Sequence, residues 1–98
     1  MRGSTPFEIT ETVDGEGVVR LVVAGELDLA TRGELERRLL ELSSAPTPVR
    51  LDLSRLEFID ASGIRVLVSA TAGTTRLVDA NLAPQVSRML AACGLPLA

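Results

Sequence analysis

The sequence predicts one α/β domain with a small mixed β-sheet and the element order β-β-α-β-α-β-α. Segments in which apolar and polar residues alternate are interspersed with segments whose apolar residues recur at helical spacing. The first two strand-like segments follow one another directly, with turn residues between them. Strands that alternate with helices form parallel pairs through right-handed crossovers, so we expect a parallel portion and one antiparallel hairpin at its edge.

The hairpin is predicted over residues 7–24. Apolar and polar side chains alternate over residues 7–13, residues 14–17 (Asp-Gly-Glu-Gly) have turn chemistry, and residues 18–24 are strongly apolar. The polar first strand suits an edge of the sheet, and the Val/Leu-rich second strand suits its interior. We expect Gly25 to end the second strand.

The first helix is predicted to begin near Thr31 and to end near Leu42. Thr31 and Glu34 have the spacing of a capping box, in which a hydroxyl and a returning carboxylate satisfy the first free amides of a helix. Leu35 and Leu39 lie on one face with Leu42, while charged residues occupy most of the other face.

The segment 49–68 combines two periodicities. Residues 49–54 alternate as a buried strand does, and the apolar residues within 64–68 have helical spacing. Between them lies Asp-Ala-Ser-Gly (60–63), which brings Ser62 to the start of a helix, where free amides favour an anionic group. Ser62 is therefore either a residue that caps or enters the helix or a regulatory phosphoserine.

The last two elements are a short strand at residues 75–79 and a final helix. Pro84 is suited to a first helical turn, and the sequence after it ends in Gly94 and Pro96. The residues predicted for the buried face of this helix are Val86, Met89, Leu90 and Cys93.

Composition excludes several classes of function. With 46% hydrophobic residues and two aromatic side chains the core must be aliphatic, and a net charge of −3 without a basic run disfavours nucleic-acid binding. The chain has no histidine and one cysteine, which excludes histidine chemistry, histidine metal sites and internal disulfides. It also has no apolar run of about 20 residues, so we expect a soluble protein without a membrane span. Cytoplasm is the default compartment, and we expect no cofactor and no metal.

Three carboxylates invite a chemical role. Asp60 either binds local backbone amides in its turn or belongs to a partner interface. A phospho-accepting aspartate of the receiver type is disfavoured, because receivers use a lysine and this chain has none. Glu26 and Asp28 lack a nucleophile or third ligand nearby in the sequence, so we interpret them as loop acids and not as a catalytic pair.

Two motifs together carry a family resemblance. GELDLAT at 25–31 and LDLSRLEFIDASGI at 51–64, with a late VDAN-to-AACGL segment, resemble the STAS domain of bacterial anti-sigma factor antagonists. The resemblance extends from about residue 7 to residue 95, and we assign residues 5–98 to one STAS domain. It implies a small mixed sheet with helices packed mainly against one face.

The resemblance also implies a function that is not enzymatic. In that family a partner that is both serine kinase and anti-sigma factor phosphorylates the serine of the D-x-S-G turn, and a phosphatase reverses the modification. The unphosphorylated domain binds the anti-sigma factor and frees the sigma factor. Carried over to this sequence, the phosphorylated residue is Ser62, and the partner-binding residues are Asp28, Asp60, Ala61, Ser62, Gly63, Ile64 and Arg65.

An alternative keeps the fold and changes the role. The chain would then be a STAS subunit of a lipid-transport or larger signalling complex, in which the Ser62 turn docks a partner without being phosphorylated. One departure from the family bears on partner identity: about five residues fewer than usual separate Gly63 from the strand at residues 75–79. We therefore expect a short second helix, about 16 Å long if it covers residues 62–72.

Overall fold

The computed structural model describes residues 6–44, 48–70, 75–78, 84–92 and 94. Its element order is the predicted one, and each predicted helix and strand is present. The elements are β1 (Glu8–Val13), β2 (Val19–Leu27), α1 (Arg32–Ser43), β3 (Val49–Ile59), α2 (Ala61–Ala70), β4 (Thr75–Val78) and α3 (Pro84–Ala92). Helix α2 is short, as expected, and Cys93 lies outside the described residues.

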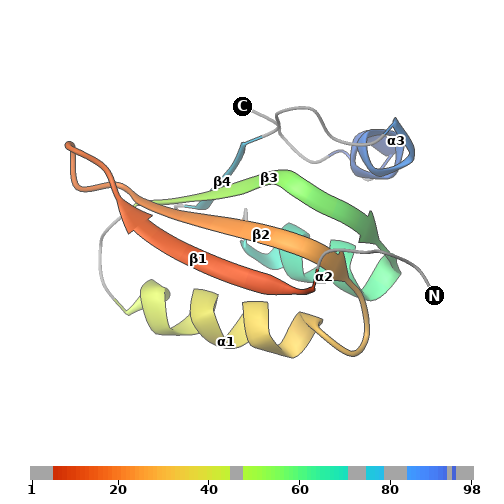
Figure 1. The fold of residues 1–98 in the computed structure, drawn as a ribbon, viewed down its shortest axis with the longest axis horizontal. Coiled ribbons are helices and arrows are strands. Elements are labelled where there is room, and N and C mark those ends of the chain that lie inside the picture. The colour runs from red at the N-terminus through yellow and green to blue at the C-terminus, as the bar shows by residue number, and fades with distance from the viewer. Residues whose placement is uncertain (1–5, 45–47, 71–74, 79–83, 93, 95–98) are drawn as a thin grey trace.

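The four strands form one mixed sheet in the order β1-β2-β3-β4 (Figure 1). Strand β1 pairs antiparallel with β2, and the pairs β2–β3 and β3–β4 are parallel. This arrangement confirms the edge hairpin. Every residue of β1 except Ile9 is exposed, which agrees with the polar sequence of an edge strand.

Asp14 organises the hairpin turn. Its Oδ1 accepts hydrogen bonds from the amides of Glu16 (2.8 Å) and Val18 (3.0 Å). These two backbone donors, of which Val18 has the larger effect, hold the pKa of the Asp14 carboxyl below its ordinary value. Gly17 follows with φ 82°, the left-handed conformation that glycine adopts without steric cost.

Strand β2 does not end at Gly25, so that prediction was wrong. Gly25 has φ 92° and lies inside the strand, which continues to Leu27. The register between β2 and β3 shifts twice, between Val22 and Ala24 and again between Gly25 and Glu26. Such bulges absorb extra residues of β3 and let the two strands stay paired to their carboxyl ends.

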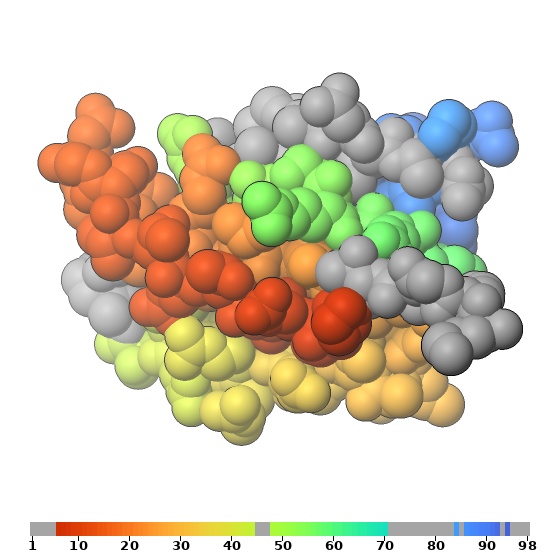
Figure 2. Space-filling view, viewed as in Figure 1, coloured from red at the N-terminus to blue at the C-terminus, as the bar shows by residue number. Residues whose placement is uncertain are grey.

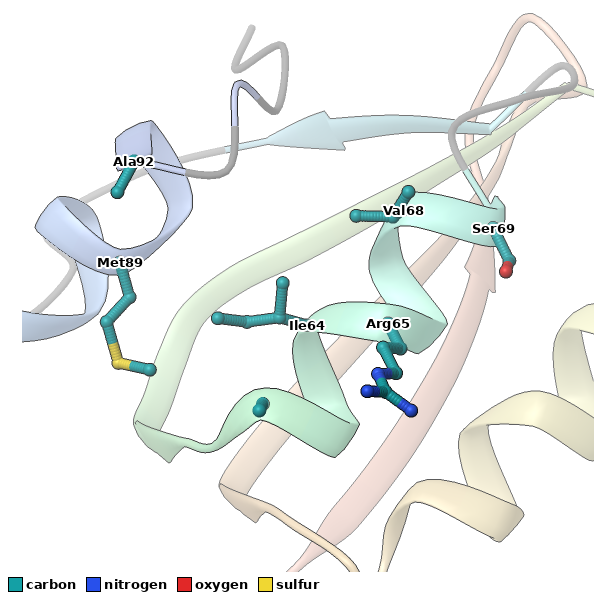
Figure 3. Close-up of a pocket in the computed structure, with 7 residues that line it drawn as sticks. Ile64, Arg65, Val68, Ser69, Met89 and Ala92 are labelled. Carbon is teal, nitrogen blue, oxygen red and sulfur yellow. The ribbon is translucent and has the colours of Figure 1, made fainter.

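One aliphatic core joins the strands to the helices. Apolar residues of β2 and β3 form this core, and the same cluster includes Leu35 of α1 and Val86 and Leu90 of α3. Helices α1 and α2 contact each other below the sheet in Figure 1, and α2 lies between α1 and α3 in Figure 3. None of the helices in the described ranges is long and apolar enough to cross a membrane.

Ion pairs connect α1 to the edge strand. Arg38 pairs with Glu11 of β1 and, at 3.1 Å, with Glu41 one turn along its own helix. Arg37 pairs with Glu41 at 3.2 Å. Figure 2 shows β1 crossing the front of the molecule directly above α1. The helix face predicted to be solvated therefore also holds the edge strand through Arg38.

Another ion pair joins neighbouring strands. Arg20 of β2 lies 2.8 Å from Asp52 of β3, whose side chain is 12% exposed. Burial opposes ionisation of Asp52, but hydrogen bonds from Ser54 and Arg20 outweigh it and lower the pKa of this carboxyl. Asp52 is thus a buried charge that is compensated by its partners.

Candidate functional site

The carboxyl ends of β2 and β3 bring the two sequence motifs together. Because these strands are parallel and paired to their last residues, the loop after Leu27 and the turn after Ile59 lie at the same edge of the sheet. The amide of Asp60 donates to the carbonyl of Leu27 (3.2 Å), which fixes the turn against the end of β2. Residues 60–65 and the segment beginning at Asp28 are therefore neighbours.

Asp60 caps helix α2. Its Oδ1 accepts hydrogen bonds from the amide of Gly63 (3.0 Å) and from the hydroxyl of Ser62 (2.6 Å), and its carbonyl accepts from the amide of Ile64 (3.0 Å). This is the geometry of an N-cap aspartate. The local backbone role considered for Asp60 is thus present, and the capping role considered for Ser62 belongs to Asp60.

Hydrogen bonds also set the charge of Asp60. The hydroxyl of Ser62 and then the amide of Gly63 stabilise the carboxylate, and the amide of Leu29 adds to them, so the pKa of Asp60 lies below its ordinary value. At neutral pH the Ser62 hydroxyl, which is half-buried, therefore faces an ionised carboxylate.

Gly63 permits the close contact between α2 and β2. A Cβ atom at this position would lie 2.6 Å from the carbonyl oxygen of Leu27 and 2.9 Å from side-chain carbons of Leu27 and Ile59. No side chain fits there without a shift of the backbone. The glycine beside Ser62 is therefore required by packing, whatever contact it makes with a partner.

Asp28 organises the adjoining loop. Its Oδ1 accepts from the amides of Ala30 (3.0 Å) and Thr31 (3.2 Å), and its carbonyl accepts from the amide of Arg32 (2.8 Å). The predicted capping box of Thr31 and Glu34 is wrong. The hydroxyl of Thr31 donates back to the carbonyl of Glu26 (2.7 Å) and makes no capping bond to the helix, because the loop supplies closer partners.

The remaining predicted residues differ in exposure. Ala61 and Arg65 are exposed, whereas Ile64 is 7% exposed and belongs to the core. All three also line an apolar groove of about 750 Å³ between α2 and α3 (Figure 3).

The sequence did not identify four further residues of this groove. They are Val68, Ser69, Met89 and Ala92. Val68 is 46% exposed, and Met89, predicted as part of a buried face, is half-buried at the groove. The helical spacing of these residues was visible, but the distance between α2 and α3 depends on the fold.

Solved structures share this fold. A crystal structure of an anti-sigma factor antagonist from Mycobacterium paratuberculosis has a TM-score of 0.76 and 28% identity, covering 96% of this chain and 88% of its own. The Bacillus cell fate determinant SpoIIAA in its phosphorylated form has a TM-score of 0.64 and 22% identity, covering 95% of this chain and 91% of its own. At 22% identity, the SpoIIAA structure shows a similarity of fold alone.

The curated relatives of this chain are also anti-sigma factor antagonists. The anti-sigma-F factor antagonist RsfB of Mycobacterium tuberculosis is 39% identical over 70 residues, which are 69% of this chain. The match spans 57% of the length of that relative. The family model described as "Mlab, STAS domain" matches residues 11–96. This chain is therefore a member of the STAS domain family.

Proposed function

We propose that this protein is an anti-sigma factor antagonist whose binding is controlled by phosphorylation of Ser62. In this proposal the unmodified protein binds a cytoplasmic anti-sigma factor and frees the sigma factor. The partner's serine kinase activity then phosphorylates Ser62 and ends the binding, and a phosphatase restores it. The protein itself is a binding module and not an enzyme.

The observation that carries the proposal is the position of the Ser62 hydroxyl. It lies in the first turn of α2, half-buried, and is oriented by a 2.6 Å hydrogen bond to Asp60. A hydroxyl held in one orientation at the edge of the molecule can be presented to a kinase active site. The 39% identity to the anti-sigma-F factor antagonist RsfB supports the antagonist role.

Phosphorylation would change the surface around this hydroxyl strongly. A phosphate adds about −1.5 to −2 charges at neutral pH, next to the carboxylate of Asp60. A partner that desolvates this turn would then meet two neighbouring anionic groups, and a desolvated charge without a partner costs binding affinity.

The proposed contact surface surrounds Ser62. It consists of the exposed or half-buried residues Asp28, Asp60, Ala61 and Arg65, with Gly63 and Ile64 supporting them from below. Gly63 and Ile64 therefore contribute to the surface by setting the position of α2 rather than by presenting side chains to the partner.

The proposal is tested by incubating the protein with ATP and a candidate anti-sigma factor that has serine kinase activity, followed by mass spectrometry. We expect one phosphate, on Ser62, and none in the Ser62→Ala variant. Ser69, exposed on the same helix, is the internal control hydroxyl. Phosphate on Ser69 alone would contradict the proposal. Binding without any phosphorylation would favour the docking subunit of a transport or signalling complex.

A further inference from the structure

We propose that the Ser62 side chain has two alternative partners on its own domain: Asp60 when the hydroxyl is free, and Arg65 when it carries a phosphate. This inference rests on the proposed phosphorylation of Ser62 and describes how the domain holds the phosphate. In this inference Arg65 pairs with the phosphate, and the carboxylate of Asp60 repels it.

The present contact of Ser62 requires a proton. The hydroxyl donates to Asp60 Oδ1 at 2.6 Å, and the same oxygen accepts the amide of Gly63 at 3.0 Å. Phosphorylation removes the hydroxyl proton, so the serine oxygen can no longer donate. Carboxylate and phosphate oxygens are both acceptors and both anionic, and they repel each other. Asp60 is retained by its bond to Gly63, and the phosphorylated side chain must therefore rotate away from Asp60.

Arg65 is positioned to bind the phosphate after this rotation. Residues three apart on a helix are neighbours on its surface, and Arg65 follows Ser62 by three positions on α2. It is the one charged residue among the ten of this helix, and it is exposed. In Figure 3 its side chain extends alongside the first turn of α2, towards α1.

The guanidinium of Arg65 is available for such a contact. No carboxylate of the described residues lies within 4 Å of it, in contrast to the arginines of α1, which pair with glutamates. The surrounding elements carry other charged groups: Asp28 in the loop after β2, Arg88 on α3, and, on the contacting helix α1, the residues Arg32, Glu34, Glu36, Arg37, Arg38 and Glu41. A guanidinium binds a phosphate with two parallel hydrogen bonds, which gives the pair both charge and geometry.

The pairing would alter the partner surface in two ways at once. The phosphate adds negative charge at Ser62, and it also occupies Arg65, which lines the groove between α2 and α3. The bond between Asp60 and the Gly63 amide does not involve Ser62, so the helix keeps its cap in the phosphorylated protein.

The experiment uses protein with phosphoserine incorporated genetically at position 62, so that no kinase is needed. The second pKa of the phosphate, about 6 in a free phosphoserine, is measured by ³¹P NMR titration. Arg65→Gln is expected to raise that pKa by roughly half a unit, and Asp60→Asn to lower it by a similar amount, as one charge about 5 Å away would. Arg65→Lys should restore most of the effect.

Arg50→Gln is the matched control. It removes the same charge from an exposed arginine at the opposite end of β3, and the pKa of the phosphate should remain at the wild-type value. Equal values for Arg65→Gln and Arg50→Gln, with both proteins folded by ¹⁵N NMR, would overturn the inference. That result would leave the proposed function standing. Conversely, a kinase assay that labels no Ser62 would end the proposed function without changing the titration.

Discussion

Replacing Gly63 with alanine should destabilise the domain, although the same change usually stabilises a helix. The new Cβ would lie 2.6 Å from the Leu27 carbonyl oxygen, about 0.8 Å inside the 3.4 Å at which ordinary contact begins. The obstacle is backbone, so the first turn of α2 must move. Overpacking typically costs about 1–3 kcal/mol, and the gain in helix propensity returns up to about 1 kcal/mol. We expect a net loss of about 1–2 kcal/mol in the free energy of unfolding.

Gly33→Ala provides the control. Gly33 is an exposed residue of α1, and a Cβ atom added to it would meet nothing within 4 Å. Alanine there should be neutral or stabilising by up to about 1 kcal/mol. The stability of both variants is measured by urea denaturation, in which a shift of the midpoint relative to wild type reports the change in the free energy of unfolding. If Gly63→Ala is as stable as Gly33→Ala, the close contact between α2 and the end of β2 is incorrect.

Three further predictions concern the core and the carboxylates. Leu35→Ala removes a fully buried side chain and should lower the free energy of unfolding by about 2–5 kcal/mol; a loss below about 1 kcal/mol would refute its central position. Asp52→Ala leaves Arg20 without its carboxylate and should cost about 1–2 kcal/mol by thermal unfolding, whereas an unchanged midpoint would show that the pair is dispensable. The pKa of Asp60 is lowered in the fold, so its ionised form stabilises the protein above the unfolded pKa of about 3.9, and this contribution disappears as the pH falls through the lower folded pKa. The stability difference between wild type and Asp60→Asn should therefore narrow between about pH 5 and pH 2 in urea titrations, and a constant difference would contradict this.

The order of elements was predictable because each element has its own periodicity. The alternation over 49–54 and the helical spacing within 64–68 are local signals, and they survive in β3 and α2. The turn between them was predicted for the same reason. Its acid and small residues suit a helix start, and Asp60 is its cap.

The errors arose where long-range contacts decide local structure. Gly25 has the sequence appearance of a strand end, but pairing with β3 carries the strand past it at a bulge. Thr31 has capping-box spacing, but its hydroxyl bonds the Glu26 carbonyl instead of a helix amide. The groove between α2 and α3 needs the packing of two helices that are separated in the sequence by β4.

The role of Ile64 illustrates the same limit. Its neighbour Ser62 places it in the family motif, and the prediction made it a contact residue. At 7% exposure its side chain serves mainly the core and one wall of the groove. Whether a residue next to a functional serine faces a partner depends on helix phase relative to the sheet, and the motif alone does not fix that phase.

The most direct test of the account is a calorimetric titration of the anti-sigma factor with this protein in its unmodified and Ser62-phosphorylated forms. We predict that the unmodified protein and Ser62→Ala bind within about twofold of each other. The phosphorylated protein should bind at least about tenfold more weakly, which corresponds to about 1.4 kcal/mol. Equal affinity of the unmodified and phosphorylated forms would contradict the claim that Ser62 controls the interaction.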